Sequence, residues 1–285
     1  SRNTVSISSI DHFSACPFLY MCESRYGLRK RFPSLYDPAK AGDLLHKLWH
    51  DAWEQREKDR GLTFVKLCDE LWDAALADKY SALASDPRLS KRQLPRLREQ
   101  ARSVALLMDE MEKGLAGSRL KSECEYKLPE LEIDGVRFKG TADRVDFYDD
   151  GVVIIDYKSN ISKSHMQELQ LAAYAKVLKE TLGLKTLGFG WIGHRDAKLS
   201  GYFAKDLLRD AYLASSKPRQ SVNERITAAE DIMTEMAKTI KKGVYPARYE
   251  NKDACRTCGF QTICRRQEAP NLESLDDETG DGADE

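Results

Sequence analysis

The sequence has no apolar run long enough to cross a membrane. A spanning helix needs about 20 consecutive apolar residues, and no stretch of the 285 residues approaches that length. The first ten residues, SRNTVSISSI, also lack the apolar core of a secretory signal. We therefore expect no membrane partner and a cytoplasmic location.

The sequence also lacks a Walker A motif, G-x-x-x-x-G-K-[ST], so these residues carry no P-loop motor. The chain has 45 basic and 46 acidic residues, but eight of the acids lie in residues 268–285, which contain no Lys or Arg. Residues 1–267 therefore carry a net charge of +7. A mildly basic body permits a polyanionic partner without requiring one. Residues 268–285 have the composition of an acidic disordered tail.

The seven cysteines are odd in number and irregularly spaced, unlike the disulfide framework of a small secreted domain. Three of them, Cys255, Cys258 and Cys264, fall within ACRTCGFQTIC. In a reducing compartment this spacing predicts a metal or cluster site that still needs a fourth ligand. Four thiolates hold either zinc or an iron–sulfur cluster, and the ligand type does not separate the two. Cys68 and Cys124 are expected to be buried as small apolar side chains.

The first 117 residues are predicted to be mostly helical. Apolar periodicity indicates helices over 40–60, 63–83 and 90–115, and Pro95 could start or kink the last of them. Before them, Ser8 and Asp11 form a capping-box pattern that predicts a short helix broken near Pro17.

The pattern then changes to strands. We expect strands over 121–133, 136–148, 152–159 and 185–195, with a tight turn at Asp149-Asp150-Gly151. Two further helices are predicted, over 162–183, ending at Gly183, and over 221–248. A strand core flanked by helices, with helices inserted before it, favours one α/β (α+β) domain.

Ionisable residues occupy the end of the most apolar strand. Residues 151–155 are apolar or small without a break, which predicts a strand buried on both faces. Asp156 and Lys158 follow and share one strand face, and the turn brings Asp143 toward the same end. Converging carboxylates favour Mg²⁺ or Mn²⁺, which can activate water for phosphodiester hydrolysis. A buried Asp–Lys pair without chemistry is the alternative for D-x-K alone.

Four motifs in order resemble the PD-(D/E)xK nuclease superfamily in its RecB-like branch. They are GDLLH (Gly42–His46), GTADRVD (Gly140–Asp146), IIDYKS with Asp156 to Lys158, and QLAAY with Gln170 and Tyr174. The resemblance covers roughly residues 5–267. It implies a restriction-endonuclease-like central mixed sheet flanked by helices, with a helical part about 40–117, a catalytic core about 118–245 and a clasp made from 16 and 255–264.

The resemblance implies roles for single residues. His46, Asp143, Asp156 and the Tyr157 carbonyl would bind Mg²⁺ or Mn²⁺, and Lys158 would assist catalysis. A Glu is expected near the Asp143 strand, but Glu123 and Glu125 share one strand face, so Glu125 is the weaker prediction.

Other polar residues of these motifs have less direct roles. Gln170 and Tyr174, spaced i, i+4, would face the metal site and bind phosphate oxygens. Arg144 and Asp146 are expected to be structural, as is His50.

Some members of the branch hold a 4Fe–4S cluster with one N-terminal and three C-terminal cysteines. HFSACPFLYMCESRYGL is similar to that N-terminal element, which makes Cys16 the expected fourth ligand and Cys22 the fallback. Zn²⁺ in the same cysteine site remains the alternative. We expect the cluster to join the two ends of the chain rather than to react.

The resemblance extends to AddB-type helicase–nucleases, CRISPR adaptation nucleases and phage exonucleases. It predicts a metal-dependent DNA nuclease of a bacterial or phage-infected cell, acting as an exonuclease on single-stranded or free DNA ends in repair or recombination. A helicase or recombination protein could be its partner. The alternative is a non-catalytic subunit that binds DNA ends as a scaffold of a helicase–nuclease complex. That reading predicts eroded motifs, whereas His46, Asp143, Asp156 and Lys158 are all intact.

Overall fold

The computed structural model describes residues 3–28, 38–77, 87–115, 118–215 and 217–265. Its centre is a five-stranded sheet in the spatial order β2-β5-β6-β7-β8. The sheet is mixed, because β6 and β7 run parallel while the other neighbours are antiparallel. The strands are β2 (Lys121–Lys127), β5 (Thr141–Tyr148), β6 (Gly151–Lys158), β7 (Thr186–Gly193) and β8 (Lys198–Phe203).

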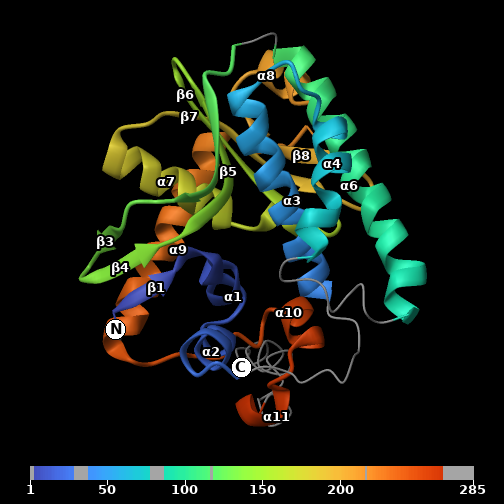
Figure 1. Cartoon of the computed structure of the whole chain (residues 1–285). Coiled ribbons are helices and arrows are strands. Elements are labelled where there is room, and N and C mark those ends of the chain that lie inside the picture. The colour runs from blue at the N-terminus through green and yellow to red at the C-terminus, as the bar shows by residue number, and fades with distance from the viewer. Residues whose placement is uncertain (1–2, 29–37, 78–86, 116–117, 216, 266–285) are drawn as a thin grey trace, which may run out of the picture.

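Helices cover both faces of this sheet, as the sequence predicts for the fold class (Figure 1). One face packs against α3 (Pro38–Lys58), α4 (Phe64–Ala77) and α6 (Pro87–Leu115). The other face packs against α7 (Gln170–Leu182) and α9 (Val222–Lys242). The short helix α8 (Asp206–Ala211) follows β8.

Strand β6 lies at the middle of both cores. Val152 and Ile154 belong to the core beneath α7 and α9, whereas Val153 and Ile155 belong to the core beneath α3, α4 and α6. All four side chains are fully buried. The prediction of a strand buried on both faces is confirmed, and its two-residue turn after Tyr148 forms the expected hairpin with β5.

The expected strands 121–133 and 136–148 are each interrupted, so this part of the prediction is wrong. A second, three-stranded sheet in the order β1-β4-β3 takes one piece of each. Asp134 and Gly135 have positive φ values of 51° and 78°, as a two-residue hairpin turn requires. Gly140 then separates the two sheets. The strands are β1 (Thr4–Ser6), β3 (Leu131–Ile133) and β4 (Val136–Lys139).

Two helix starts also differ from expectation. The helix predicted over 162–183 begins only at Gln170, because the 3-10 turn η3 (His165–Gln167) and an extended Glu168 precede it. Ser8 and Asp11 form no capping box; Ser9 is the N-cap of α1 (Ile10–Ala15), and no side chain caps it. Pro95 lies inside α6 without ending it. Gly183 does end α7, with a left-handed φ of 66°.

Segments from near the two ends of the chain lie side by side below the sheet (Figure 1). Helices α2 (Pro17–Tyr20) and η2 (Met21–Arg25) follow α1, and Pro17 is the first residue of α2. They lie beside α10 (Lys252–Thr257) and α11 (Gln261–Cys264). The acidic tail and residues 78–83 of the second predicted helix fall outside the described residues. No helix within the described ranges is long and apolar enough to span a bilayer.

Candidate functional site

The exit of β6 brings Asp143 beside Asp156 and Tyr157. The antiparallel register pairs Arg144 with Ile155, so the chain next to Arg144 meets the chain next to Ile155. There the Tyr157 backbone N–H donates a 2.8 Å hydrogen bond to Asp143 Oδ2. The two motif strands therefore meet at one point, as the spacing of the motifs predicts.

Helix α3 delivers His46 to the same point. Its Nε2 lies 3.2 Å from the Tyr157 carbonyl oxygen, and its Nδ1 lies 3.7 Å from Asp143 Oδ2. The Tyr157 residue thus contacts the carboxylate through its N–H and the imidazole through its C=O. The Tyr157 carbonyl, which the family resemblance implies as a metal ligand, therefore lies beside His46.

Glu125 completes a group of three potential metal ligands. One ligand atom each from His46, Glu125 and Asp143 lies within 4.8 Å of the others. Glu125 has a left-handed φ of 48°, which non-glycine residues adopt rarely. Glu123 instead forms an ion pair with Lys121. The structure thus separates two glutamates that the sequence leaves equivalent.

Asp156 lies beside this group and pairs with Lys158. Lys158 Nζ is 3.0 Å from Asp156 Oδ2. Asp156 is only 4% exposed, and Lys158 is the partner of its Oδ2. A carboxylate oxygen is also the kind of ligand that Mg²⁺ or Mn²⁺ prefers. The three side chains that already bring their ligand atoms within 4.8 Å of one another are nevertheless His46, Glu125 and Asp143.

The charges of the site are strongly coupled. Burial, and then the neighbouring Asp156, raise the pKa of Asp143 to about 6, although His46 and the Tyr157 N–H lower it. Burial disfavours a charged Lys158, but Asp156 overrides this effect and raises the pKa of Lys158. A cation added among the carboxylates would relieve their repulsion. The side chains present therefore fit a hard divalent metal ion such as Mg²⁺ or Mn²⁺.

A buried network holds the Tyr157 side chain. Arg144 Nη1 donates a 3.0 Å hydrogen bond to the Tyr157 hydroxyl, and Arg144 Nε lies 3.1 Å from Asp146 Oδ1. Asp146 also accepts hydrogen bonds from Ser122 and, at 2.6 Å, from Tyr212. The Tyr157 ring stacks on Trp49 with centroids 4.7 Å apart. Arg144 and Asp146 thus hold the residue that contacts His46 and Asp143.

Gln170 and Tyr174 pair with each other on α7. Gln170 Nε2 donates a 2.9 Å hydrogen bond to the Tyr174 hydroxyl. Tyr174 is 2% exposed, and its ring packs directly on Gly140, where an added Cβ would lie 2.6 Å from Tyr174 Cε1. The motif glycine therefore makes room for the motif tyrosine. Their predicted role in phosphate binding stays a prediction.

Three polar residues near the site were missed by the sequence reasoning. Asp11 Oδ1 accepts a 2.6 Å hydrogen bond from the Leu169 N–H, just before α7, so the predicted capping residue acts on another helix. Burial raises the pKa of Glu168, close to Lys158, to about 7. Burial, followed by His46, lowers the pKa of His194 to about 4, so this imidazole is neutral at physiological pH. Glu168 adjoins a motif that could have drawn attention to it; the local pattern around Asp11 predicted a different role, and His194 carries no local signal.

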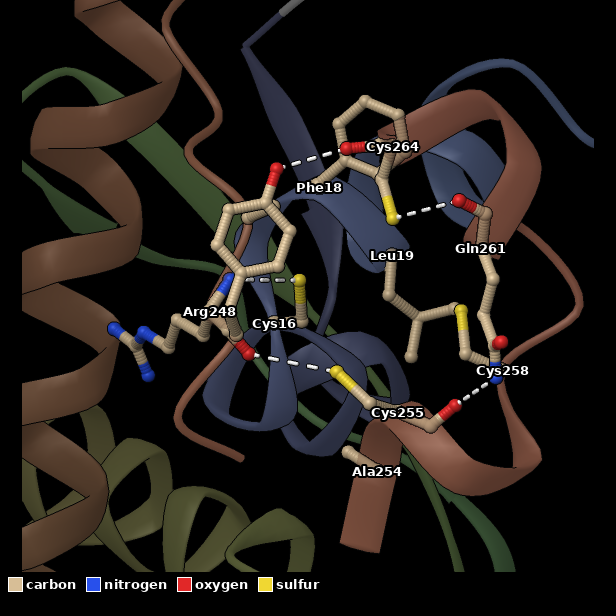
Figure 2. Close-up of a pocket in the computed structure, with 11 residues that line it drawn as sticks. Cys16, Phe18, Leu19, Arg248, Ala254, Cys255, Cys258, Gln261 and Cys264 are labelled. Carbon is tan, nitrogen blue, oxygen red and sulfur yellow. Dashed lines mark hydrogen bonds between the residues drawn. The ribbon is translucent and has the colours of Figure 1, made fainter. Parts of the chain in front are cut away.

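The four predicted cluster cysteines line one pocket. Cys16 comes from the α1–α2 junction, and Cys255, Cys258 and Cys264 come from α10 and α11. Figure 2 shows the four sulfur atoms turned toward one another across this pocket. None of the seven cysteines, all of which lie in the described ranges, forms a disulfide.

Backbone groups surround these sulfurs. The Arg248 N–H lies 3.4 Å from Cys16 Sγ, and the Phe260 N–H lies 3.4 Å from Cys258 Sγ. Such N–H donors stabilise thiolates and tune iron–sulfur clusters. The donor set fits a four-thiolate group, whether a 4Fe–4S cluster or Zn²⁺.

Protein contacts also tie the two chain ends together. Arg248 Nη1 donates a 2.7 Å hydrogen bond to the Ser14 carbonyl oxygen, and Asn251 Nδ2 donates one of 3.1 Å to the Ala15 carbonyl oxygen. The cysteine pocket is therefore assembled in part by ordinary hydrogen bonds that need no cluster.

The other cysteines and His50 lie elsewhere. Cys22 is 2% exposed and does not line the pocket, although Cys258 and Cys16 are close enough that they add to burial in raising its pKa. Cys68 is buried, and burial raises its pKa to about 12; Cys124 is half-buried rather than fully buried. His50 pairs with Asp51 at 3.1 Å.

The chain belongs to the PD-(D/E)XK nuclease superfamily, whose model matches residues 4–265. It is 25% identical over 296 residues to a subunit of the ATP-dependent helicase/deoxyribonuclease of Thermoanaerobacter sp. (strain X514), and equally so to that of Thermoanaerobacter pseudethanolicus (strain ATCC 33223 / 39E). These matches cover 90% of this chain and 25% of each relative, so the chain spans about a quarter of their length. The solved structure of SSO0001 superposes with a TM-score of 0.39 at 13% identity, covering 93% of this chain and 86% of that one.

Replacing Asp143 by Asn should stabilise the metal-free protein at neutral pH. A carboxyl whose folded pKa is about 6, against 3.8 when unfolded, loses stability as pH rises between these values. The side chain is 21% exposed, and the shift corresponds to about 2–3 kcal/mol. In EDTA, the melting temperature of Asp143→Asn should fall less between pH 4 and pH 7 than that of the wild type. Mn²⁺ should raise the melting temperature of the wild type only.

Asp149→Asn, which removes an exposed carboxylate from the β5–β6 turn, is the matched control. It should keep the wild-type pH dependence and the response to Mn²⁺. Equal stabilisation of Asp143→Asn by Mn²⁺ would contradict the assignment of Asp143 as a ligand.

Gly140→Ala should destabilise the protein by about 1–3 kcal/mol, because the new methyl group displaces the buried Tyr174 ring. Gly42→Ala is the control: it lies within α3, has nothing within 4 Å of its added Cβ, and should be neutral or stabilising by up to about 1 kcal/mol. Urea unfolding of both variants measures the difference. Equal stability of Gly140→Ala and wild type would contradict this prediction, because it would mean that the Tyr174 ring moves aside at no cost in free energy.

Cys16→Ser should remove most of the bound metal from protein purified without air, because it deletes one of the four sulfurs around the pocket. Cys22→Ser deletes a thiol that does not line the pocket and should retain the metal. Iron and zinc per chain, with the visible absorbance spectrum, measure the outcome. Full metal content in Cys16→Ser together with loss in Cys22→Ser would transfer the role to Cys22.

Proposed function

We propose that this chain is a metal-dependent deoxyribonuclease that hydrolyses phosphodiester bonds. The observation that supports this best is the meeting of His46, Glu125 and Asp143 within 4.8 Å, beside the Asp156–Lys158 pair. A nuclease superfamily chain with these groups at one strand end has both the ligands and the cation that the reaction needs. Eroded carboxylates would have favoured a binding role without catalysis instead.

His46, Glu125, Asp143 and Asp156 would hold Mg²⁺ or Mn²⁺, with the Tyr157 carbonyl beside them. The metal ion would supply a Lewis acid and lower the pKa of water. Lys158 keeps its proton because Asp156 lies 3.0 Å away, so its ammonium can orient water and stabilise negative charge on the phosphate. Glu168, with a pKa of about 7, is placed to accept a proton near Lys158.

We further propose that the substrate is single-stranded DNA with a free end and that cleavage is exonucleolytic. A single strand can thread a narrow, positively lined path, whereas a duplex needs a wide groove. The relatives are named as subunits of a helicase/deoxyribonuclease, and a helicase partner would produce such strands. With a helicase partner, the nuclease would act in DNA recombination or repair.

We also propose that Cys16, Cys255, Cys258 and Cys264 hold a 4Fe–4S cluster that joins the chain ends. Cys16 precedes Cys255 by 239 residues, so closing this long loop restricts the unfolded chain strongly. Zn²⁺ would give the same constraint with a colourless protein. The absorbance measurement on Cys16→Ser and wild type therefore decides between the two as well.

Asp156→Asn and Lys158→Met should each lower Mn²⁺-dependent cleavage of single-stranded DNA by at least about 100-fold, because the first removes a proposed metal ligand and the second the proposed cation that stabilises charge on the phosphate. Lys163→Met, an exposed lysine shortly after β6, is the control and should keep most activity. End-labelled linear strands and a circular single strand are the substrates. Rapid cleavage of the circle would reject exonuclease action, and full activity of Lys158→Met would reject the site.

A further inference from the structure

Helix α6 runs along β7 from one end of the sheet to the other. Near its C-terminus, Gly114 and Leu115 line a pocket with Leu187, at the start of β7. Fourteen residues earlier, Gln100 Oε1 lies 3.1 Å from His194 Nδ1, just past the end of β7. Fourteen helical residues rise ~21 Å, and the seven residues from Leu187 to His194 extend ~23 Å as a strand. The two elements are therefore antiparallel, and Gln100 is level with the end of β7.

That end of β7 is the end that carries the metal centre. The His194 N–H donates a 2.9 Å hydrogen bond to the Lys158 carbonyl oxygen. Gln100 is thus one contact away from the residue at which β6 ends. The part of α6 that precedes Gln100 extends beyond the ends of the strands, as the teal N-terminal half of the helix shows in Figure 1. Arg96 lies ~6 Å and Arg92 ~12 Å farther along the axis.

The two flanks of α6 carry different arginines. Arg98 and Arg102 face α4, where both approach Asp69, at 3.8 Å and 2.6 Å. Successive helical residues turn by ~100°, so Arg96 and Arg92 stand ~40° and ~80° from Gln100, whereas Arg98 and Arg102 stand ~160° from it. Both are exposed, and neither forms an ion pair with any described residue.

We propose that Arg92 and Arg96 form a phosphate-binding ridge that holds the DNA strand as it approaches the metal centre. The proposal rests on the proposed function, since it assigns the path of that substrate. Guanidinium groups bind phosphate oxygens with two parallel hydrogen bonds. Arg92 and Arg96 have no acidic partner among the described residues, whereas Arg98 and Arg102 are neutralised by Asp69.

The negative charge of the metal centre explains why a DNA strand would need a basic ridge beside it. Glu125, Asp143, Asp156 and Glu168 lie together at the exit of β6 and repel a polyanion. Cations beside the centre offset that repulsion and fix the strand in register with it. An exposed pair of arginines one and two turns from Gln100 meets this requirement.

The test is binding of a short fluorescein-labelled oligothymidine in EDTA, followed by anisotropy at several salt concentrations. Arg92→Ala and Arg96→Ala should each weaken binding about 3- to 10-fold and reduce the salt slope by ~0.7, the value for one lost phosphate contact on a single strand. The double variant should lose ~1.4. Arg98→Ala removes the same charge from the same helix and should keep the wild-type slope.

Cleavage by each protein in Mn²⁺ keeps the two proposals distinguishable. Active wild type with unchanged binding by the double variant would overturn the ridge and leave the nuclease function standing. Wild type that binds the strand through the two arginines without cleaving it would overturn the nuclease function alone. Equal slope losses in Arg98→Ala and Arg96→Ala would show a general charge effect and overturn the ridge. Arg96→Lys should recover most of the salt slope if a phosphate contact is made.

Discussion

The architecture depends on one constraint: β6 is buried on both faces and yet ends in Asp156 and Lys158. Buried charges cost several kcal/mol each unless they find partners, and the charged groups at this exit do find them. Lys158 pairs with Asp156, and the Tyr157 N–H binds Asp143. These partners still leave Asp143 with a raised pKa, because burial and the neighbouring carboxylates of Asp156 and Glu125 disfavour its charged form. The protein has thus assembled a site whose electrostatics favour a cation.

The cysteine pocket and the metal centre are linked through α1. This helix begins one residue before Asp11, which holds the Leu169 N–H at the start of α7, and it ends directly before Cys16. Helix α1 therefore connects Cys16 to the start of the helix that carries Gln170 and Tyr174. The proposed cluster would fix Cys16 and, through this connection, the start of α7. In small metal sites, binding of the metal ion or cluster is likewise coupled to folding.

Sequence reasoning predicted the buried strand, its hairpin, the flanking helices and the family, because each rests on a local pattern. It failed where the cause is tertiary. The strand expected over 136–148 divides at Gly140, where β4 and β5 join different sheets and the Tyr174 ring packs on the glycine, and no pattern within that segment reports these contacts. Glu125 is distinguished from Glu123 by its backbone conformation and by the arrival of His46, and neither can be read from the strand pattern. Asp11 looks like a local cap, but its acceptor function serves a residue 158 positions away.

Net charge explains little about how such a chain would handle a nucleic acid. A body charge of +7 spread over 267 residues attracts a polyanion weakly, and the metal centre itself concentrates carboxylates. What matters is the placement of unpaired cations relative to the strand ends. Ion pairs such as Arg102–Asp69 and Arg119–Glu57 neutralise one side of the helical layer. The neutral His194–Gln100 contact packs α6 against the end of β7. The same contact sets which arginines of α6 would lie near a strand on the proposed path.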